Sequence, residues 1–134
     1  MGSGPDSLTL EQIEGRYWGE PPADATRLIK TVHELRRKPL AALDIEDLRV
    51  LLLQKEGVDV LVPIALTRLE QNPLAEGDFY PGDLLNAVLK IPEAYWRQHP
   101  DQHRRVSAVV AAAERLATSE RPPGTPWRSV RGQR

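Results

Sequence analysis

Apolar side chains recur in this sequence at the three- and four-residue spacing of amphipathic helices. In residues 25–38, Leu28, Val32 and Leu35 fall on one face of a helix, which Pro39 ends. Further helical segments are residues 9–14, 44–57, 59–71, 81–89, 92–99 and 101–118. No segment alternates apolar and polar residues as a half-buried strand does, so the pattern predicts an all-α fold of about six or seven short helices.

Capping residues and prolines indicate where these helices begin and end. Thr9, followed by Gln12, is typical of a capping box, and Gly15 is suited to end that short helix. Pro81 is expected at the first position of its helix, where an amide hydrogen has no helical partner. The side-chain caps expected for other helices are Asp24, Asp44 and Asp101. Residues 7–118 should form one compact bundle, and the Pro- and Arg-rich residues 119–134 a disordered tail.

Length and charge narrow the class of protein. The chain of 134 residues suits one domain and carries 18 Lys and Arg against 19 Asp and Glu. Residues 119–134 hold four Arg and one Glu, a net charge of +3, so that the body before them has a net charge of −4. An acidic body argues against a dedicated nucleic-acid binder and favours a basic protein partner.

Several kinds of site are excluded or disfavoured. Because the chain has no Cys, it has no disulfide, thiolate metal site or cysteine nucleophile, and a reducing compartment, the cytoplasm, is expected. The longest apolar runs, Val50–Leu53 and Val60–Leu66, are far shorter than the ~20 residues of a membrane span. Known catalytic and nucleotide-binding motifs do not occur, so no enzyme activity, catalytic residue or cofactor is expected.

The three histidines do not predict a metal site. His99 and His103 have i,i+4 spacing, but Pro100 lies between them and disfavours the continuous helix that a zinc pair needs. His33 lies within an amphipathic helix, where a packing role is expected. No metal is therefore predicted.

Paired aromatic residues are the first candidates for binding. Tyr17–Trp18, Phe79–Tyr80 and Tyr95–Trp96 each lie near Pro or Gly at the edge of a helical segment. Neighbouring side chains on irregular backbone do not easily point the same way. We therefore expect one member of each pair to enter the core, while the other is available as an interface anchor.

A stretch of acidic residues supplies the second set of candidates. Residues 69–89 contain Glu70, Glu76, Asp78 and Asp83 but no Lys or Arg. Asp78 is expected to accept hydrogen bonds from loop amides, and Asp83 to lie in the first turn of a helix, where the helix dipole favours its charge. A pair of hydrolase carboxylates is the alternative, but the stretch contains no histidine. An acidic rim that meets a cationic partner is favoured.

Several segments of the chain match a known pattern. They are residues 8–15, 18–22, 33–36, 47–49 and 72–74, and above all the run EGDFYPGDLL at 76–85. On these segments the chain, over roughly residues 8–100, resembles one family of immunity proteins of contact-dependent growth inhibition (CDI) systems, the CdiI proteins. The resemblance implies a protein that binds a cognate toxin domain, often a nuclease. It also implies that residues 33–36 maintain the fold.

The leading expectation is an immunity protein that binds the C-terminal domain of its toxin and blocks the active site or substrate access. Toxin nucleases are generally cationic because they bind phosphates, and an acidic surface can steer onto them. The candidate contact residues are Tyr17, Trp18, Glu76, Asp78, Tyr80 and Asp83. A small helical adaptor of another complex is the alternative, and a nucleic-acid-associated protein that uses the Arg-rich tail is a third reading.

Overall fold

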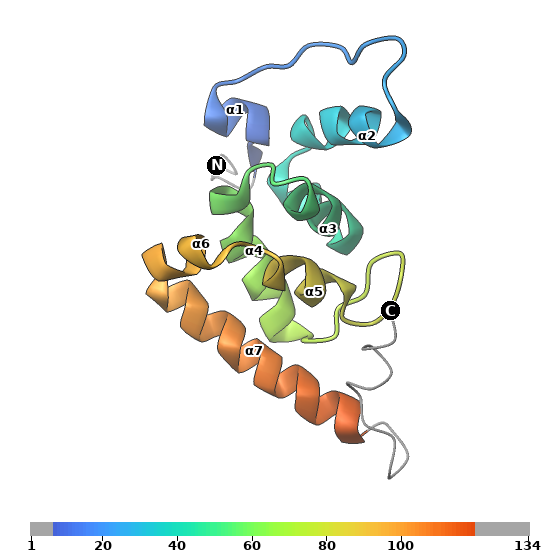
Figure 1. Ribbon diagram of the computed structural model, residues 1–134. Helices are drawn as coiled ribbons and strands as arrows, with labels where there is room; N and C mark the ends of the chain where they lie inside the picture. Colours follow the sequence, from blue (N-terminus) through green and yellow to red (C-terminus); the bar gives the residue numbers. More distant parts are fainter. Residues whose placement is uncertain (1–6, 120–134) are drawn as a thin grey trace.

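Helices dominate residues 7–119, the part of the chain that the computed structural model describes (Figure 1). They are α1 (Leu10–Glu14), α2 (Arg27–Arg36), the 3₁₀ helix η2 (Leu40–Ala42), α3 (Ile45–Leu53), α4 (Val58–Gln71), α5 (Asp83–Leu89), α6 (Glu93–Gln98) and α7 (Pro100–Ser119). Within the described residues, β pairing is limited to one bridge between Glu76 and Pro81. The predicted all-α fold is confirmed. The predicted tail at 119–134 lies, after Ser119, outside the described residues.

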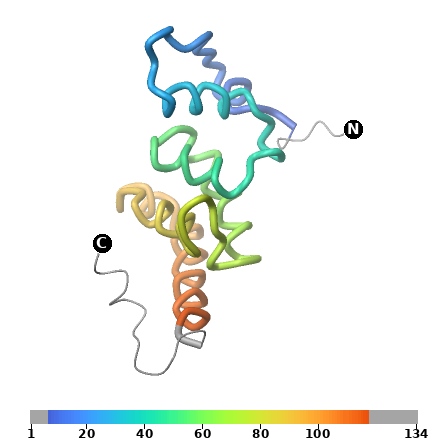
Figure 2. The backbone as a smooth tube through the Cα atoms, turned by 90° about the vertical axis from the view of Figure 1, so that its right-hand side faces the viewer, coloured from blue at the N-terminus to red at the C-terminus, as the bar shows by residue number. Residues whose placement is uncertain are grey.

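The helices are arranged along the length of the molecule. Figures 1 and 2 show α1, α2 and the arched connection between them at one end, α3 in the middle, and α4 to α7 at the other end. The longest helix, α7, has 20 residues and packs against α4 and α6. No helix of the described part is long and apolar enough to cross a membrane.

The core is built mainly from leucines of α3, α4 and α5. The most deeply buried apolar side chains are Leu10, Leu43, Leu48, Leu51, Leu61, Val62, Leu66, Leu69, Leu84 and Val88. Each fully buried side chain of this size contributes roughly 1.5–3 kcal/mol of transfer free energy. Helix α3 packs against α2, α4 and α5. Its first turn contacts the loop that joins α4 to α5, where the Asp78 amide donates a hydrogen bond to Glu46.

Several predicted helix ends are confirmed. Thr9 and Gln12 form a capping box at the start of α1, and Gly15 ends that helix in the left-handed conformation. Asp44 and Asp47 form a second capping box at the start of α3. In each box, a side chain at the cap and one three residues later satisfy amides that the helix itself leaves unpaired.

The boundaries of α2 and α3 differ from the prediction. α2 begins after Thr26, whose hydroxyl accepts a hydrogen bond from the Ile29 amide at 3.1 Å, and not after Asp24. A threonine placed three residues before that amide has the geometry of an N-cap, which Asp24 lacks. α3 ends at Leu53, before the predicted end at Gly57.

The starts of α5 and α7 also differ from the prediction. α5 begins at Asp83 and not at Pro81, because Gly82 has a φ of 90° and interrupts the helical path. α7 begins at Pro100 itself. Since a first-turn residue needs no amide hydrogen, proline is tolerated there, and Asp101 lies inside the first turn and not at the cap.

The apolar stripe of α2 is buried only in part. Val32 and Leu35 enter the core as predicted, but Leu28 and Ile29 are each 44% exposed. The first turn of α2 therefore presents apolar surface to solvent.

Candidate functional site

A buried carboxylate fixes the loop between α4 and α5. Asp83 is 3% exposed. Its Oδ1 accepts a hydrogen bond from the Gly77 amide at 2.7 Å, and its Oδ2 accepts from the amides of Phe79 at 3.0 Å and Tyr80 at 3.4 Å. The sequence pattern assigned this role to Asp78, whose side chain is exposed instead. The first residue of α5 thus holds the loop that precedes it.

The first turn of α3 holds the same loop from the other side. Glu46 Oε1 accepts from the Asp78 amide at 2.9 Å and from Arg49 Nε at 2.8 Å, while Glu46 Oε2 accepts from Arg49 Nη2 at 2.5 Å. The Arg49 hydrogen bond holds the pKa of Glu46 below its usual value, and the same bond raises the pKa of Arg49. Glu46 and Arg49 therefore stay ionised and paired.

The two aromatic residues of the loop point in different directions. The Arg49 guanidinium lies over the ring of Phe79, 4.4 Å from its centroid, and Phe79 is 66% exposed. Tyr80 is half-buried, and its Oη accepts a hydrogen bond from Asn86 Nδ2 of α5 at 2.7 Å. One ring is thus presented to solvent, and the other lies against α5.

Two glycines allow the loop to follow this path. A Cβ on Gly77 would lie 2.4 Å from Glu46 Oε1 and 3.2 Å from Glu46 Cα, so any larger residue would displace the Glu46 carboxylate that holds the loop. Gly82 has a φ of 90°, and its amide donates to the carbonyl of Leu74 at 3.1 Å. Residues other than glycine rarely adopt that backbone conformation.

The four acids of the predicted acidic stretch have different environments. Glu70 forms a two-point salt bridge with Arg105 of α7, at 2.8 and 2.9 Å, and does not belong to the loop. Asp83 is buried under the loop. Glu76 and Asp78 are exposed on its outer side.

Tyr17 and Trp18 lie away from this loop, on the connection between α1 and α2 at one end of the molecule (Figure 1). Tyr17 is 67% exposed and Trp18 is 36% exposed, so neither enters the core and the prediction for this pair is wrong. The Trp18 ring lies 4.5 Å from the Arg36 guanidinium, with its centroid 4.8 Å from that of His33. The pair Tyr95–Trp96 follows the prediction, because Trp96 is buried and Tyr95 is partly exposed.

Arg36 is fully buried and joins three segments of the chain. Its Nη1 donates to Glu14 at 2.7 Å and to Glu56 at 3.2 Å, and its Nη2 donates to the carbonyl of Arg16 at 3.0 Å. It secures α1 and the segment that carries Tyr17 to the body of the protein, in keeping with the fold-maintaining role that the family resemblance implied for residues 33–36.

The histidines have structural partners. His33 Nδ1 donates to the carbonyl of Gly19 at 3.1 Å, and His99 Nδ1 donates to the carbonyl of Tyr95 at 2.8 Å. In residues 7–119 no group of three or more His, Asp or Glu side chains has the arrangement of a metal site. His33 thus helps to hold the connection between α1 and α2.

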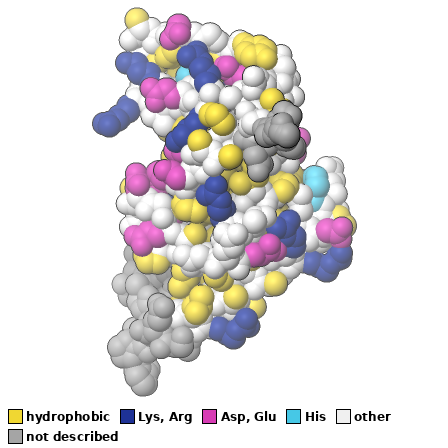
Figure 3. All heavy atoms as spheres, turned by 180° about the vertical axis from the view of Figure 1, so that it is seen from behind, with side chains coloured by type: hydrophobic (Ala, Val, Ile, Leu, Met, Phe, Trp, Pro, Cys, Tyr) yellow, Lys and Arg dark blue, Asp and Glu magenta, His cyan; other side chains and the backbone are white. Residues whose placement is uncertain are grey.

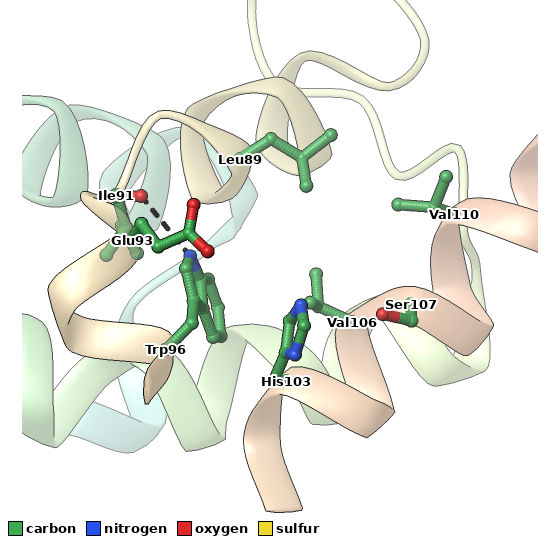
Figure 4. A pocket seen from close by; sticks show the side chains of 8 residues that line it. All are labelled: Leu89, Ile91, Glu93, Trp96, His103, Val106, Ser107 and Val110. Carbon is green, nitrogen blue, oxygen red and sulfur yellow. Dashed lines mark hydrogen bonds between the residues drawn. The ribbon is translucent and has the colours of Figure 1, made fainter. Parts of the chain in front are cut away.

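A groove of about 470 Å³ lies between α5, α6 and α7 (Figure 4). Its lining residues are Leu89, Ile91, Glu93, Trp96, His103, Val106, Ser107 and Val110. Trp96 Nε1 donates to the carbonyl of Ile91 at 3.2 Å and closes one wall. Among the lining residues drawn in Figure 4, the hydrogen bond shown is the one from Trp96 to Ile91.

The surface seen from behind carries charges of both signs. In Figure 3, Lys and Arg side chains are interspersed with Asp and Glu side chains on that face and do not form a continuous basic stripe. Nucleic-acid binders normally show such a stripe.

The structure gathers some of the predicted site residues and separates others. Glu76, Asp78 and Tyr80 lie on the loop between α4 and α5, and Asp83 is the residue that follows it, whereas Tyr17 and Trp18 lie on the separate connection between α1 and α2, at one end of the molecule (Figure 1). The sequence pattern did not single out Glu46 and Arg49 as site residues, because their partners are about 30 positions away in the chain. The sequence pointed to the exposed Phe79 only as a member of the aromatic pair Phe79–Tyr80.

Comparison with known proteins gives one match. A family model of CDI immunity proteins matches residues 12–106, which include α2 to α6 and both segments with candidate residues. No curated protein and no solved structure matches the chain.

Proposed function

The chain belongs to the CDI immunity proteins, and from that premise we propose that it binds the C-terminal toxin domain of its own CDI system in the cytoplasm and blocks that domain by occupying its active site or substrate groove. The match over residues 12–106 carries this proposal. Neutralisation by binding needs a preformed surface and no catalytic group. We propose that the protein acts as an inhibitor and not as an enzyme.

The fixed loop between α4 and α5 is our proposed contact surface. Its exposed acids are Glu76 and Asp78, and Tyr80 lies at its edge. Because the loop amides are already bonded to Asp83 and Glu46, little conformational entropy is lost on binding. We propose that Asp83 supports this surface from beneath, since its carboxylate is buried.

A nuclease is the toxin class that this charge favours. Counting Glu46, Glu76, Asp78 and Asp83 against Arg49 gives the loop and its support a net charge of −3. A nuclease groove is lined with cations because it must bind phosphates. An acidic loop can occupy that groove and exclude the nucleic acid.

Tyr17 and Trp18 form a second proposed contact area. Tyr17 is the more exposed of the two, and Trp18 is held by a cation–π contact with Arg36 and an edge-to-face contact with His33. Aromatic side chains with a polar tip are frequent in protein interfaces. A toxin domain that covers both areas would span from α1 to the α4–α5 loop.

Co-expression tests the proposed function. The C-terminal domain of the secreted protein encoded directly upstream is expressed in bacteria with and without this chain. We expect growth arrest without the chain, rescue with it, and a stable complex of the two purified proteins on gel filtration. If the two proteins do not associate and growth is not rescued, the proposal is wrong, and a helical adaptor of another complex becomes the better reading.

A further inference from the structure

Phe79 presents a large apolar ring on a loop whose backbone is fixed around it. The side chain is 66% exposed. Its own amide donates to Asp83 at 3.0 Å, and the preceding amide, of Asp78, donates to Glu46 at 2.9 Å. The backbone that carries the ring is therefore fixed, while most of the apolar area of the ring stays exposed.

The ring also rests on a fixed support. The Arg49 guanidinium lies 4.4 Å from the ring centroid, and Glu46 holds that guanidinium at 2.8 and 2.5 Å. Cation–π contact of this kind favours one orientation of the ring. One face of Phe79 is thus covered by the protein, and much of its rotamer freedom is lost before any partner arrives.

From this geometry we infer that Phe79 is the apolar anchor of the toxin interface, and that it fits a hydrophobic cleft of the toxin rimmed by Lys or Arg side chains. This inference rests on the proposed function and specifies the partner surface. Large, preoriented aromatic side chains are the residues that most often dominate binding free energy.

The charges around Phe79 indicate which class of partner binds there. Glu76 and Asp78 are exposed in the same loop, and the charge of Arg49 is offset by Glu46. A second copy of the chain would bring two acidic loops together, and like charges would repel. Nucleic acid would be repelled for the same reason. The exposed acids favour a cationic toxin surface, and a hydrophobic cleft in that surface would bury the Phe79 ring.

The anchor and the acids should affect different rate constants. Long-range attraction by Glu76 and Asp78 acts on association and weakens with salt. Short-range burial of the Phe79 ring acts on dissociation and is nearly independent of salt. Kinetics therefore distinguish an anchor from a residue that only adds charge or supports the fold.

The test measures binding of the upstream-encoded toxin domain to Phe79→Ala and Phe79→Leu by surface plasmon resonance at low and high salt. Leu89→Ala is the matched control, because Leu89 is another exposed apolar residue, 48% exposed, on the neighbouring α5. We expect Phe79→Ala to raise Kd about 30-fold or more, mostly through dissociation and equally at both salt concentrations. Phe79→Leu should lose less affinity, and Leu89→Ala should bind within about twofold of the unmodified chain.

Different failures have different meanings. If the unmodified chain binds the toxin and Phe79→Ala binds equally well, the inference is wrong and the proposed function stands. If the unmodified chain does not bind the toxin, the proposed function fails and the anchor assignment fails with it. If gel filtration shows that the free chain forms a dimer that Phe79→Ala dissociates, a second copy is the occupant and the inference is also wrong. Circular dichroism of each variant verifies that it is folded.

Discussion

The Asp83 carboxylate accepts a hydrogen bond from the Gly77 amide at 2.7 Å, so the first residue of α5 fixes a loop that ends just before it. The same carboxylate also accepts hydrogen bonds from the amides of Phe79 and Tyr80. A buried charge is tolerated here because several donors surround it and Arg49 lies 4.0 Å away. The exposed surface of the loop thus depends on a side chain that does not reach the surface.

Replacement of Asp83 should destabilise the free protein. In Asp83→Ala, the loop amides lose their acceptor, and we expect the free energy of unfolding to fall by about 1–3 kcal/mol. Asp78→Ala is the control, because that side chain is exposed, and a change within about 0.5 kcal/mol is expected. Urea unfolding monitored by circular dichroism measures both. Equal stabilities for the two variants would contradict the assigned role of Asp83.

Gly77 and Gly82 should respond differently to the same substitutions. Gly77→Ala places a methyl group 2.4 Å from Glu46 Oε1, and overpacking of this kind costs about 1–3 kcal/mol. At Gly82, the nearest atom to a new Cβ is Leu74 Cδ2 at 3.6 Å, so Ala there should cost only the ~1–2 kcal/mol of the left-handed backbone. Asn should recover part of the loss at Gly82 and none at Gly77. Thermal unfolding of the Ala and Asn variants at both positions tests this prediction. A gain in stability from Ala to Asn at Gly77 but not at Gly82 would contradict it.

Removal of the buried Arg36 should loosen the N-terminal end. Arg36→Met leaves Glu14 and Glu56 without their shared cation, and loss of one partner of a buried ion pair costs about 3–5 kcal/mol. Arg16→Ala is the control, because Arg16 is exposed and lies 3.9 Å from the same Glu14; a change below about 1 kcal/mol is expected. Chemical denaturation tests both. A stable Arg36→Met variant would mean that these carboxylates are solvated without Arg36.

The pairing of Glu46 with Arg49 should make stability depend on pH. Because the pKa of Glu46 is lower in the folded state, the unfolded chain binds more protons in the acid range, and stability rises with pH. This contribution is complete above the unfolded pKa of about 4.3 and is lost as the pH falls through the lower folded value. Glu46→Gln should flatten this part of the curve. Urea midpoints between pH 7 and pH 3 test the effect, which an unchanged acid limb in Glu46→Gln would refute.

Local sequence predicts the helices and some of their ends, because these depend on residues three or four positions apart. The capping boxes of Thr9 and Asp44 are of this kind. The ion pairs of Arg36 could not be predicted from the helical pattern, because its partners Glu14 and Glu56 lie 22 and 20 positions away. Distant partners of this kind become visible only in the folded chain.

In the candidate site, too, the features set by nearby residues could be predicted, and those set by distant residues could not. Sequence predicted an acidic stretch at residues 69–89 that contains the aromatic pair Phe79–Tyr80, and that composition is purely local. Asp83 lies in the first turn of α5 as predicted. The prediction that the loop amides donate to Asp78 is wrong, because the left-handed Gly82 turns the loop so that these amides meet the Asp83 carboxylate. The contribution of Glu46 depends on the packing of α3 against α5, which no local pattern encodes.

Charge reversal at the exposed acids tests how the toxin is approached. The double variant Glu76→Lys and Asp78→Lys should slow association at low salt about tenfold or more, because steering by a cleft of opposite charge accelerates encounter by roughly 10–1,000-fold. The on-rate of the unmodified chain should also fall as salt rises.

Glu93→Lys combined with Asp101→Lys is the control, since it makes the same change in net charge with exposed residues of α6 and α7. If net charge alone governs association, both double variants slow it equally. If the loop steers the toxin, only the first does so, and the difference disappears at high salt because the Debye length shortens to about 3 Å at 1 M. Stopped-flow measurements at two salt concentrations decide between these outcomes. An on-rate unaffected by the loop charges would move the first contact to the connection that carries Tyr17 and Trp18, where exposed aromatic surface, and not charge, would guide the encounter.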